Sequence, residues 1–530
     1  MHTAGQKKHG GGSQEELVSA MLEPTFYPRR PSKVIHKETH ISHVFLTDDL
    51  VYKVKKAVRF SFLDYSTLPK RRHFLNEELR LNRRLAPSVY LAVMPISFDA
   101  GGWRLGGWSE PAEYTLVMRR LPERRMLPFL LDSGQLTPEM MRSLANVLAP
   151  FHADAERVQT NEPFRYPLNI QKDWAENLAE LQPFFGTWIE EDGFAALQQF
   201  GAGFLDKHHE LFLKRINDGW IRDVHGDLHC EHICFAPEGI QVFDCIEFSP
   251  RLRCCDLASE IAFLLMDLEV RGGGELRRPF LTRYLELLAD RDLPTLLSFY
   301  QCYRALVRGK VEALRSTGAD SMAPRYFRYA LRFPWLDLMP FLVIVCGLTG
   351  SGKSMLARTL GERLGTPVIN SDILRKTIAG KLGRQIVPLN AGIYSSNMTE
   401  KTYKKIAQQA EKQIFEGRAA ILDATFGRKK HREMIIRIAE KHKVPLLFIH
   451  CSVSEELTEQ RLNRRALEGS DVSDGRWEIY AAQKAAYQPI QEVPSESCLE
   501  LNTAAPVEEL AIRSERFLRS RLNKTESETA

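Results

Sequence analysis

The stretch GLTGSGKS, from Gly347 to Ser354, limits the possible folds of this chain more than any other feature. It satisfies the pattern G-x-x-x-x-G-K-[S/T], directly after the apolar run at 341–346 and directly before a segment with helical spacing. Average residue frequencies produce this pattern by chance in roughly one such chain in a hundred, and the correct flanking segments lower that figure further. A glycine-rich turn between a strand and a helix indicates an α/β unit in this part of the chain.

The residue types in this loop suit a polyphosphate. Glycines let backbone N–H groups close around phosphate oxygens at the N-terminus of a helix. We expect Lys353 to reach the terminal phosphates and Ser354 to hold Mg²⁺. The predicted nucleotide-binding residues of the loop are Gly347, Thr349, Gly350, Ser351, Gly352, Lys353 and Ser354. The alternative is a glycine-rich turn that binds no nucleotide.

Short apolar segments alternate with helical ones from about residue 340 onwards. The predicted strands are FLVIVCGL, TPVIN, AAILDAT and PLLFIHC, and helices are expected from there to about residue 520. Strands and helices in alternation indicate a parallel sheet with helices on both faces.

Charged residues follow the predicted strands of this unit. Asp372 lies just past the second strand, where open α/β sheets collect ligands, with Arg375 one helical turn later. Asp423 closes AAILDAT and is expected to hold a Mg²⁺-bound water beside the substrate, or else to cap the next helix. The segment RLNRR supplies three arginines for a lid over the phosphates, or for a solvated helix face: Arg461, Arg464 and Arg465.

A second constellation lies in HGDLHCEHIC, residues 225–234. A kinase catalytic loop needs an aspartate as base, a metal ligand about five residues later and a second metal-binding aspartate after a short strand. Asp227 and His232 occupy the first two positions, and Asp244 is expected on a strand within 240–248. Upstream, Lys53 lies within a predicted strand and suits phosphate oxygens, and Glu78 on the next helix is placed to orient it.

Zinc is the competing interpretation of the same stretch. It contains ligand types that bind zinc, but they lack the paired spacings of finger or ribbon sites. The candidates are His225, His229, Cys230, His232 and Cys234. In the kinase interpretation the two cysteines are small apolar fillers.

The length of 530 residues exceeds what one hydrophobic core usually supports, so at least two domains are expected. Strand patterns dominate 33–56, helical patterns dominate from about 135 to 220, and the segment at 316–329 is the predicted linker. We expect a flexible N-terminal tail and helix at 1–25, one domain at 26–335, the loop-containing domain at 336–515 and a C-terminal tail at 516–530.

Composition indicates a folded protein in a reducing compartment. An apolar fraction of 44%, a charged fraction of 26% and a net charge of +5 are ordinary, so charge does not favour nucleic acid as a partner. Nine unevenly placed cysteines do not resemble a disulfide framework. We find no apolar run of the length needed for a signal peptide or membrane span, so a cytoplasmic protein without a membrane partner is expected.

The C-terminal motifs carry a resemblance to a known group of enzymes. The phosphate loop, the S-D-x-x-R segment, LDATF and the arginine-rich helix resemble those of small P-loop kinases, which include zeta toxins, gluconate kinases and polynucleotide kinase domains. The resemblance covers residues 340 to about 500 and implies a catalytic role for Asp372 and an acceptor-phosphate contact for Arg375.

The N-terminal motifs resemble the aminoglycoside phosphotransferase family, which has a protein-kinase-like fold. HGDLH with FDCIEF, ETHIS, the LNRRLAP helix and a C-terminal phosphate loop are similar to bacterial fusions of such a domain with an ATP-binding domain. The resemblance runs over nearly the whole chain. It implies that Lys53 contacts the nucleotide, that Ser42 in the ETHIS turn lies over it, and that Asp256 orients the catalytic loop.

One position departs from that family. Asparagine is expected where this chain has His232, and imidazole is a poor ligand for Mg²⁺ but suits zinc or manganese. Three outcomes are open: one metal instead of two, a changed metal preference, or a domain that binds nucleotide without transferring phosphate.

Two functional hypotheses follow. The first is a bifunctional ATP- and Mg²⁺-dependent phosphotransferase, with one site per domain, acting on hydroxyl groups of small molecules or nucleotides. A nucleic-acid 5′-hydroxyl is a possible acceptor that the sequence does not favour. The second is a C-terminal P-loop kinase or ATPase regulated by a degenerate, ligand-sensing N-terminal domain. His232 favours the second hypothesis, and the complete set of Lys53, Asp227 and Asp244 favours the first.

Overall fold

A computed structural model describes residues 13–60, 63–107, 110–158, 168–315, 321–380, 395–468 and 476–529, without the side chains of 168–169, 465–468 and 524–529. The chain divides into two compact units. Unit 1 comprises Met1–Gln182 and Ala202–Tyr326, and unit 2 comprises Pro183–Gly201 and Phe327–Ala530. Helices α6 (Glu191–Lys207) and α12 (Ala323–Ala330) each contribute residues to both units.

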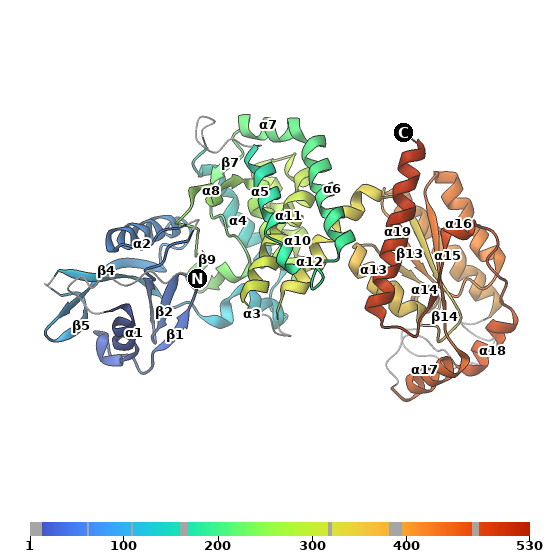
Figure 1. The fold of residues 1–530 in the computed structure, drawn as a ribbon, viewed down its shortest axis with the longest axis horizontal. Coiled ribbons are helices and arrows are strands. Elements are labelled where there is room, and N and C mark those ends of the chain that lie inside the picture. Colours follow the sequence, from blue (N-terminus) through green and yellow to red (C-terminus); the bar gives the residue numbers. More distant parts are fainter. Residues whose placement is uncertain are drawn as a thin grey trace. The chain divides into compact units, whose positions relative to one another are not determined.

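Unit 1 contains a six-stranded antiparallel sheet in the order β1-β2-β3-β6-β4-β5. Its strands are β1 (Ile35–Glu38), β2 (Ser42–Leu46), β3 (Leu50–Lys55), β4 (Tyr90–Asp99), β5 (Gly102–Leu105) and β6 (Pro111–Arg119). Two helices accompany this sheet, α1 (Gln14–Leu22) and α2 (Leu68–Asn82) (Figure 1).

Strand β3 shows how the alternation of side chains builds this part of the site. Tyr52 and Val54 point into the apolar core that contains α1 residues. Lys53 and Lys55 therefore point to the opposite face, because successive residues of a strand alternate between faces. Glu78 of α2 lies on that face and contacts both lysines. Helix α1 begins at a capping box on Ser13, whereas residues 1–12 of the expected tail lie outside the described residues.

The rest of unit 1 is mainly helical. Its helices are α3 (Leu127–Asp132), α4 (Pro138–Asp154), α5 (Leu168–Ala179), α7 (His209–Asn217), α8 (Pro250–Arg253), α9 (Leu257–Val270), α10 (Arg277–Leu288) and α11 (Leu293–Arg315). Two short antiparallel pairs flank the segments that contain the site residues: β7 (Ile221–Asp223) with β10 (Cys254–Asp256), and β8 (Ile233–Ala236) with β9 (Gly239–Val242). Helix α9 is buried over most of its length and packs mainly against α11.

Unit 2 contains a five-stranded parallel sheet in the order β12-β13-β11-β14-β15. Its strands are β11 (Leu342–Cys346), β12 (Val368–Asn370), β13 (Ala420–Asp423), β14 (Leu446–Ser452) and β15 (Cys498–Asn502). The helices after α12 are α13 (Lys353–Leu364), α14 (Ser371–Ile378), α15 (Ser396–Phe415), α16 (Lys429–His442), α17 (Glu455–Glu468), α18 (Trp477–Ala485) and α19 (Val507–Thr529).

The parallel sheet has a separate apolar core on each face. Val343 and Val345 of β11 belong to the core that includes α13 and α19, whereas Leu342 and Ile344 belong to the core that includes α15 and α16. Burial on both faces explains why β11 is apolar throughout. The predicted α/β sheet with helices on both faces is confirmed, and unit 1 has the predicted kinase-like arrangement of an antiparallel sheet with one lysine-orienting helix beside a helical region (Figure 1).

Four local predictions differ from the structure. Residues 498–502 form β15 rather than helix, because this edge strand pairs in parallel with β14. The expected tail at 516–530 is largely the end of α19, where Leu518 and Leu522 are buried in the core. Part of the expected linker is α12, whose Tyr326 and Phe327 are buried. Strand β9 ends at Val242, so Asp244 lies beyond it.

Within the described part of the chain, no helix combines the length and the apolar character needed to cross a membrane.

Candidate functional site

Lys53 lies at the centre of the candidate site of unit 1. Its ammonium group is 2.7 Å from Glu78 Oε1 and 2.9 Å from Asp244 Oδ1. These contacts join β3, α2 and the segment after β9, which are far apart in the sequence. The structure thus joins the predicted pair of Lys53 and Glu78 to Asp244, which lies far away in the sequence.

A second lysine supports the same helix. Lys55 is fully buried, and its ammonium group lies 2.8 Å from Glu78 Oε2 and 2.5 Å from Glu247 Oε1. The hydroxyl of Tyr65 also donates to Glu247, at 2.7 Å. Glu78 therefore uses one oxygen for each lysine. Sequence reasoning missed Lys55 and Glu247, although the two-residue spacing from Lys53 places Lys55 on the same face of the strand.

The loop at 225–232 is held by a buried carboxylate. Glu260 of α9 accepts hydrogen bonds from the backbone N–H of His225 at 2.9 Å and of Gly226 at 3.1 Å. Gly226 has φ +80°, and a Cβ there would lie 2.9 Å from Arg253 Cα, so only glycine fits without displacing the backbone. Burial raises the pKa of Glu260 to about 7, against the opposing effect of Arg304 and the two N–H groups.

Asp256 is the N-cap of α9 and is fully buried. Its carboxylate caps the helix through the N–H of Ala258 and forms two hydrogen bonds with Arg215, both at 2.7 Å. Asp256 therefore stabilises the start of the helix that carries Glu260, which in turn holds the 225–232 loop.

Asp244 adopts a left-handed backbone conformation with φ +64°, which is uncommon for a residue other than glycine. Its N–H donates to the Tyr90 hydroxyl at 3.0 Å, and the N–H of Cys245 donates to Asn82 Oδ1 at 2.9 Å. These contacts fix the turn that aims the Asp244 carboxylate at Lys53.

Two histidines flank Asp227. His229 Nε2 lies 3.5 Å from Asp227 Oδ2, and His232 Nδ1 lies 2.9 Å from the Asp227 carbonyl oxygen. His232 Nε2 lies 3.6 Å from Asp244 Oδ2. Asp227, His232 and Asp244 are therefore neighbours in space, as the kinase interpretation requires.

Burial and neighbouring polar or charged groups together determine the pKa values of three side chains in this site. Burial alone raises the pKa of Asp244, but Lys53 and His232 hold it below its ordinary value. Burial likewise opposes ionisation of Asp227, and His229 and His232 hold the pKa of Asp227 well below its ordinary value. Burial lowers the pKa of Lys53, yet Asp244 and Glu78 outweigh it and raise that pKa well above its ordinary value. All three side chains are charged at neutral pH.

The donor set in unit 1 does not fit Mg²⁺ well. Asp244 offers carboxylate oxygen, but the other predicted ligand, His232, offers only imidazole nitrogen. Mg²⁺ prefers oxygen ligands in octahedral geometry. Ser42 does not fit its expected contact with the nucleotide either, because it is fully buried at the start of β2.

The phosphate loop of unit 2 has the backbone that its glycines require. Gly347, Gly350 and Gly352 have φ values of +143°, +81° and +82°. A Cβ at Gly347 would lie 2.3 Å from the carbonyl oxygen of Cys451, so the loop passes close to the end of β14. Helix α13 begins at Lys353 directly after the loop, which places the positive end of the helix dipole beside it.

Asp423 lies at the end of β13, which is the neighbour of β11 in the sheet. Asn370 donates to its Oδ2 at 2.5 Å. Burial raises the pKa of Asp423, while the charge of Lys353 and hydrogen bonds from Ser354 and Asn370 lower it. The Ser354 hydroxyl and the Asp423 carboxylate are thus neighbouring oxygen donors, a combination that fits Mg²⁺.

The predicted acceptor residues lie on α14. Arg375 Nη1 is 2.7 Å from Asp372 Oδ1, so the predicted pair forms one turn of a helix that begins at the N-cap Asn370. Asn370 therefore links Asp372 to Asp423, because its side chain bonds the N–H of Asp372 and the carboxylate of Asp423. Sequence reasoning missed Asn370.

Arg461 braces the phosphate loop. It donates to the Thr503 carbonyl at 2.6 Å and the Thr503 hydroxyl at 3.1 Å, and Thr503 donates to the Ser351 carbonyl at 2.7 Å. Arg461 thus bonds Thr503 in this structure, and its predicted contact with phosphate stays a prediction. The side chain of Arg465 lies outside the described residues.

A residue of α18 contacts the loop as well. The backbone N–H of Thr349 donates to Gln483 Oε1 at 2.9 Å. This N–H belongs to the loop expected to surround phosphate oxygens, so Gln483 offers a carbonyl oxygen to a group that a phosphate would use. Nothing in the local sequence distinguishes Gln483 from an ordinary helical glutamine.

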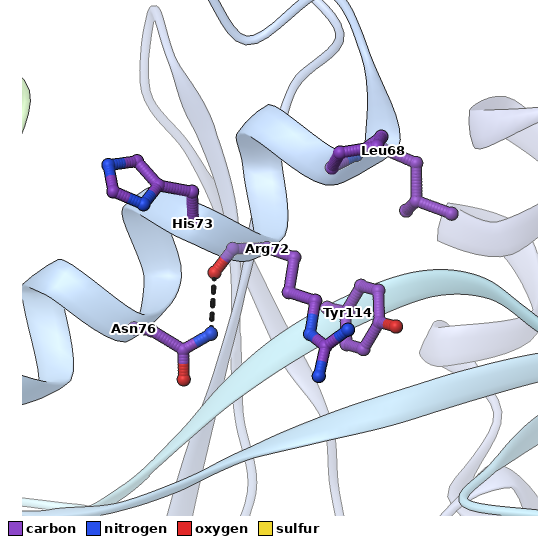
Figure 2. A pocket seen from close by; sticks show the side chains of 6 residues that line it. Leu68, Arg72, His73, Asn76 and Tyr114 are labelled. Atoms are coloured by element: carbon purple, nitrogen blue, oxygen red, sulfur yellow. Dashed lines mark hydrogen bonds between the residues drawn. The ribbon is translucent and has the colours of Figure 1, made fainter.

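A surface pocket of about 460 Å³ opens beside α2. Figure 2 shows Arg72 beside the ring of Tyr114, at 5.2 Å from the ring centroid, and Asn76 donating to the Arg72 carbonyl at 2.8 Å. Leu68, Pro69 and His73 complete the lining. The lining contains none of the predicted site residues.

The fold and sites define a protein with a P-loop nucleotide-binding unit and a kinase-like unit in one chain. Residues 342–490 match the family model described as an AAA domain. The uncharacterized protein Rv2004c of Mycobacterium tuberculosis (strain ATCC 25618 / H37Rv) is 31% identical over 454 residues, which cover 85% of this chain and 90% of that protein. The chain belongs to the same family as that mycobacterial protein.

Another mycobacterial protein and two solved structures are also similar to this chain. The uncharacterized protein Mb2027c of Mycobacterium bovis (strain ATCC BAA-935 / AF2122/97) also shares 31% identity over 454 residues, covering 85% of this chain and 90% of that protein. A choline/ethanolamine kinase family protein from Mesorhizobium loti covers 60% of this chain and 93% of its own, with 14% identity and a TM-score of 0.36. A gluconokinase from Sinorhizobium meliloti 1021 matches over 36% of this chain and 98% of its own chain, with 18% identity and a TM-score of 0.28.

Proposed function

We propose that this protein is an ATP-dependent phosphotransferase with one nucleotide site per unit, acting on hydroxyl groups of small molecules or nucleotides. The observation that carries the proposal is the convergence of Lys53, Glu78, Asp227 and Asp244 in unit 1, in addition to the phosphate loop of unit 2. A nucleotide-binding fold alone explains the loop, but not the second constellation.

In unit 1, Asp227 is the proposed base. Its low pKa keeps it ionised at neutral pH, so it can accept the proton of an acceptor hydroxyl as the oxygen attacks the terminal phosphorus. His229 lies against the Asp227 carboxylate and orients it. Lys53, held by Glu78, is placed to neutralise phosphate oxygens.

In unit 2, the amides of the phosphate loop and the Lys353 ammonium group are proposed to hold the polyphosphate. Ser354 and Asp423 would hold Mg²⁺, which neutralises charge on the phosphate oxygens when bound. Asp372 is the proposed base. Arg375 contacts Asp372 in the structure and is proposed to turn to the acceptor when it binds.

The acceptor is proposed to be neutral or anionic rather than a polycation such as an aminoglycoside. Polycations need unpaired acidic side chains. The acidic residues on α5 are already paired, since Arg251 contacts both Asp173 and Glu176. On α6, Asp192 lies 2.7 Å from Arg516.

The regulatory alternative is supported by one observation, the imidazole of His232 at a predicted metal position. In that alternative unit 1 binds a ligand without transferring phosphate, and only unit 2 consumes ATP.

Two variants of the full-length protein separate these functions. With γ-labelled ATP and a panel of hydroxyl acceptors, Asp227→Asn should abolish transfer to one set of acceptors and Lys353→Ala transfer to another. The matched controls are Asp132→Asn and Lys405→Ala, both at exposed positions. If Asp227→Asn leaves every ATP-consuming activity unchanged while Lys353→Ala removes all of them, unit 1 is not a phosphotransferase and the regulatory alternative holds.

A further inference from the structure

His232 and Asp244 form an open pair of ligand atoms in unit 1. His232 Nε2 lies 3.6 Å from Asp244 Oδ2, while Asp244 Oδ1 is already used by Lys53. Asp227 and His229 lie beside the pair, and Asp227, His229 and His232 each place one ligand atom within 4.8 Å of the others.

The hydrogen bonds determine which nitrogen of each ring carries the proton. The Asp227 carbonyl oxygen can only accept, so His232 Nδ1 must be the donor of the 2.9 Å contact between them. In the neutral imidazole this leaves the lone pair on Nε2, the atom that faces Asp244. His229 has the opposite arrangement, because its Nδ1 accepts from the N–H of Glu231 and its Nε2 therefore donates to Asp227.

The result is a nitrogen lone pair facing a carboxylate oxygen at a separation that suits a shared metal ion. Bonds of about 2.0–2.2 Å to both atoms subtend an angle of roughly 110–130° across a 3.6 Å gap, which is at or somewhat above the tetrahedral angle. Asp227 Oδ2 lies 3.7 Å from His232 Nδ1, the protonated nitrogen, so Asp227 is a neighbour of the pair and not one of its two ligands.

We propose that unit 1 binds a divalent first-row transition-metal ion, of the zinc or manganese class, through His232 Nε2 and Asp244 with Asp227 beside them. Imidazole with carboxylate suits these ions, whereas Mg²⁺ takes oxygen ligands. The inference rests on the proposed function for the position of the site, but metal binding itself is measured without nucleotide.

A hydrogen bond provides the competing explanation. If Nε2 carried a proton as well, it would donate to Asp244, and the ring would only pair with the carboxylates of Asp227 and Asp244. In that case replacing His232 would not weaken the binding of a transition metal.

Manganese electron spin-echo spectroscopy distinguishes the two, because nitrogen coupled to bound Mn²⁺ reports an imidazole ligand directly. The experiment uses the full chain carrying Asp423→Asn, which removes the predicted metal ligand of unit 2. We expect nitrogen modulation in this protein and its loss in the additional variant His232→Asn. The matched control His450→Asn changes a histidine of β14 in unit 2 and should keep the modulation.

Calorimetric titration of the same proteins supplies the affinity. In the chain carrying Asp423→Asn alone, we expect Zn²⁺ to bind at least tenfold more tightly than Mg²⁺. The ratio of the Zn²⁺ affinity to the Mg²⁺ affinity should fall at least tenfold when His232→Asn is added. Asp244→Asn, as an independent second variant, should also weaken Zn²⁺ at least tenfold. Absence of nitrogen coupling, or equal coupling in His232→Asn, overturns the proposal, as does a Zn²⁺ affinity that neither variant changes.

Failure of this inference and failure of the proposed function give different results. Nitrogen coupling without any Asp227-dependent transfer retains the metal site and removes the phosphotransferase role of unit 1. Asp227-dependent transfer without nitrogen coupling retains the phosphotransferase role of unit 1 and removes the metal site.

Discussion

The buried lysine of β3 allows the strongest test of how unit 1 is held together. Lys55 bridges Glu78 and Glu247, and its side chain and that of Glu78 are fully buried. Methionine has a similar shape, so Lys55→Met removes the charge with little change of volume. Removing one partner of a buried ion pair costs about 3–5 kcal/mol when the other charge is left alone.

The structure places this substitution at the lower end of that range. Glu78 keeps Lys53 at 2.7 Å, and Glu247 keeps the hydroxyl of Tyr65, also at 2.7 Å. We therefore expect a loss of about 3 kcal/mol in the free energy of unfolding of unit 1. At about 2 °C per kcal/mol for a large unit, its melting midpoint should fall by about 6 °C.

Lys53→Met is the matched control, two residues away on the same face. Asp244, whose side chain is 44% exposed, keeps water as a partner, and Glu78 keeps Lys55. We expect a loss of about 1 kcal/mol or less for this partly exposed pair, together with loss of nucleotide binding by unit 1. Differential scanning calorimetry and hydrogen exchange of β3 and α2 measure the two effects.

The reasoning would be refuted if Lys55→Met melted like the unsubstituted protein, or if Lys53→Met were destabilised as much as Lys55→Met. Either result would mean that Glu78 does not divide its oxygens between the two lysines as the structure shows.

Two further predictions concern the loops. Gln483→Ala frees the Thr349 N–H, which should then bind phosphate without competition from the glutamine. One hydrogen bond is worth about 0.5–1.5 kcal/mol, so the nucleotide affinity of unit 2 should rise about two- to tenfold in an equilibrium titration. Glu260 has a pKa raised to about 7, so the native state binds more protons than the unfolded state above the ordinary pKa. Stability should therefore fall as pH rises from about 4.5 to 7, and Glu260→Gln should flatten this slope in pH-dependent denaturant titrations; an unchanged slope would contradict the assignment.

The sequence was sufficient for the parts of the site that depend on local pattern. The phosphate loop is a continuous stretch with fixed flanks, so Gly347, Gly350 and Lys353 could be placed without tertiary information. The predicted relation of Lys53 to Glu78 also followed from local order, because a strand is followed directly by a helix.

The missed residues depend on contacts between distant segments. The contact of Lys55 with Glu247 joins residues 192 positions apart, and the contact of Gln483 with Thr349 joins residues 134 positions apart. The edge strand β15 was missed for a related reason, since its pattern Cys-Leu-Glu-Leu-Asn becomes a strand by pairing with β14. Arg461 has lid-like spacing in the sequence, but its partner Thr503 determines its contact.

The conformation of Asp244 bears on both proposals for unit 1, phosphotransfer and the binding of a transition metal. A left-handed aspartate costs roughly 1 kcal/mol or more, so the surrounding contacts must hold it in place. The Tyr90 hydroxyl and the Asn82 side-chain oxygen do so by accepting hydrogen bonds from the backbone N–H groups of Asp244 and Cys245. As a result, one oxygen of the Asp244 carboxylate contacts Lys53 and the other faces His232. An extended residue after β9 would send the side chain elsewhere. These contacts therefore hold one carboxylate between a cation and an imidazole, which is the arrangement that the proposed polyphosphate and metal sites of unit 1 require.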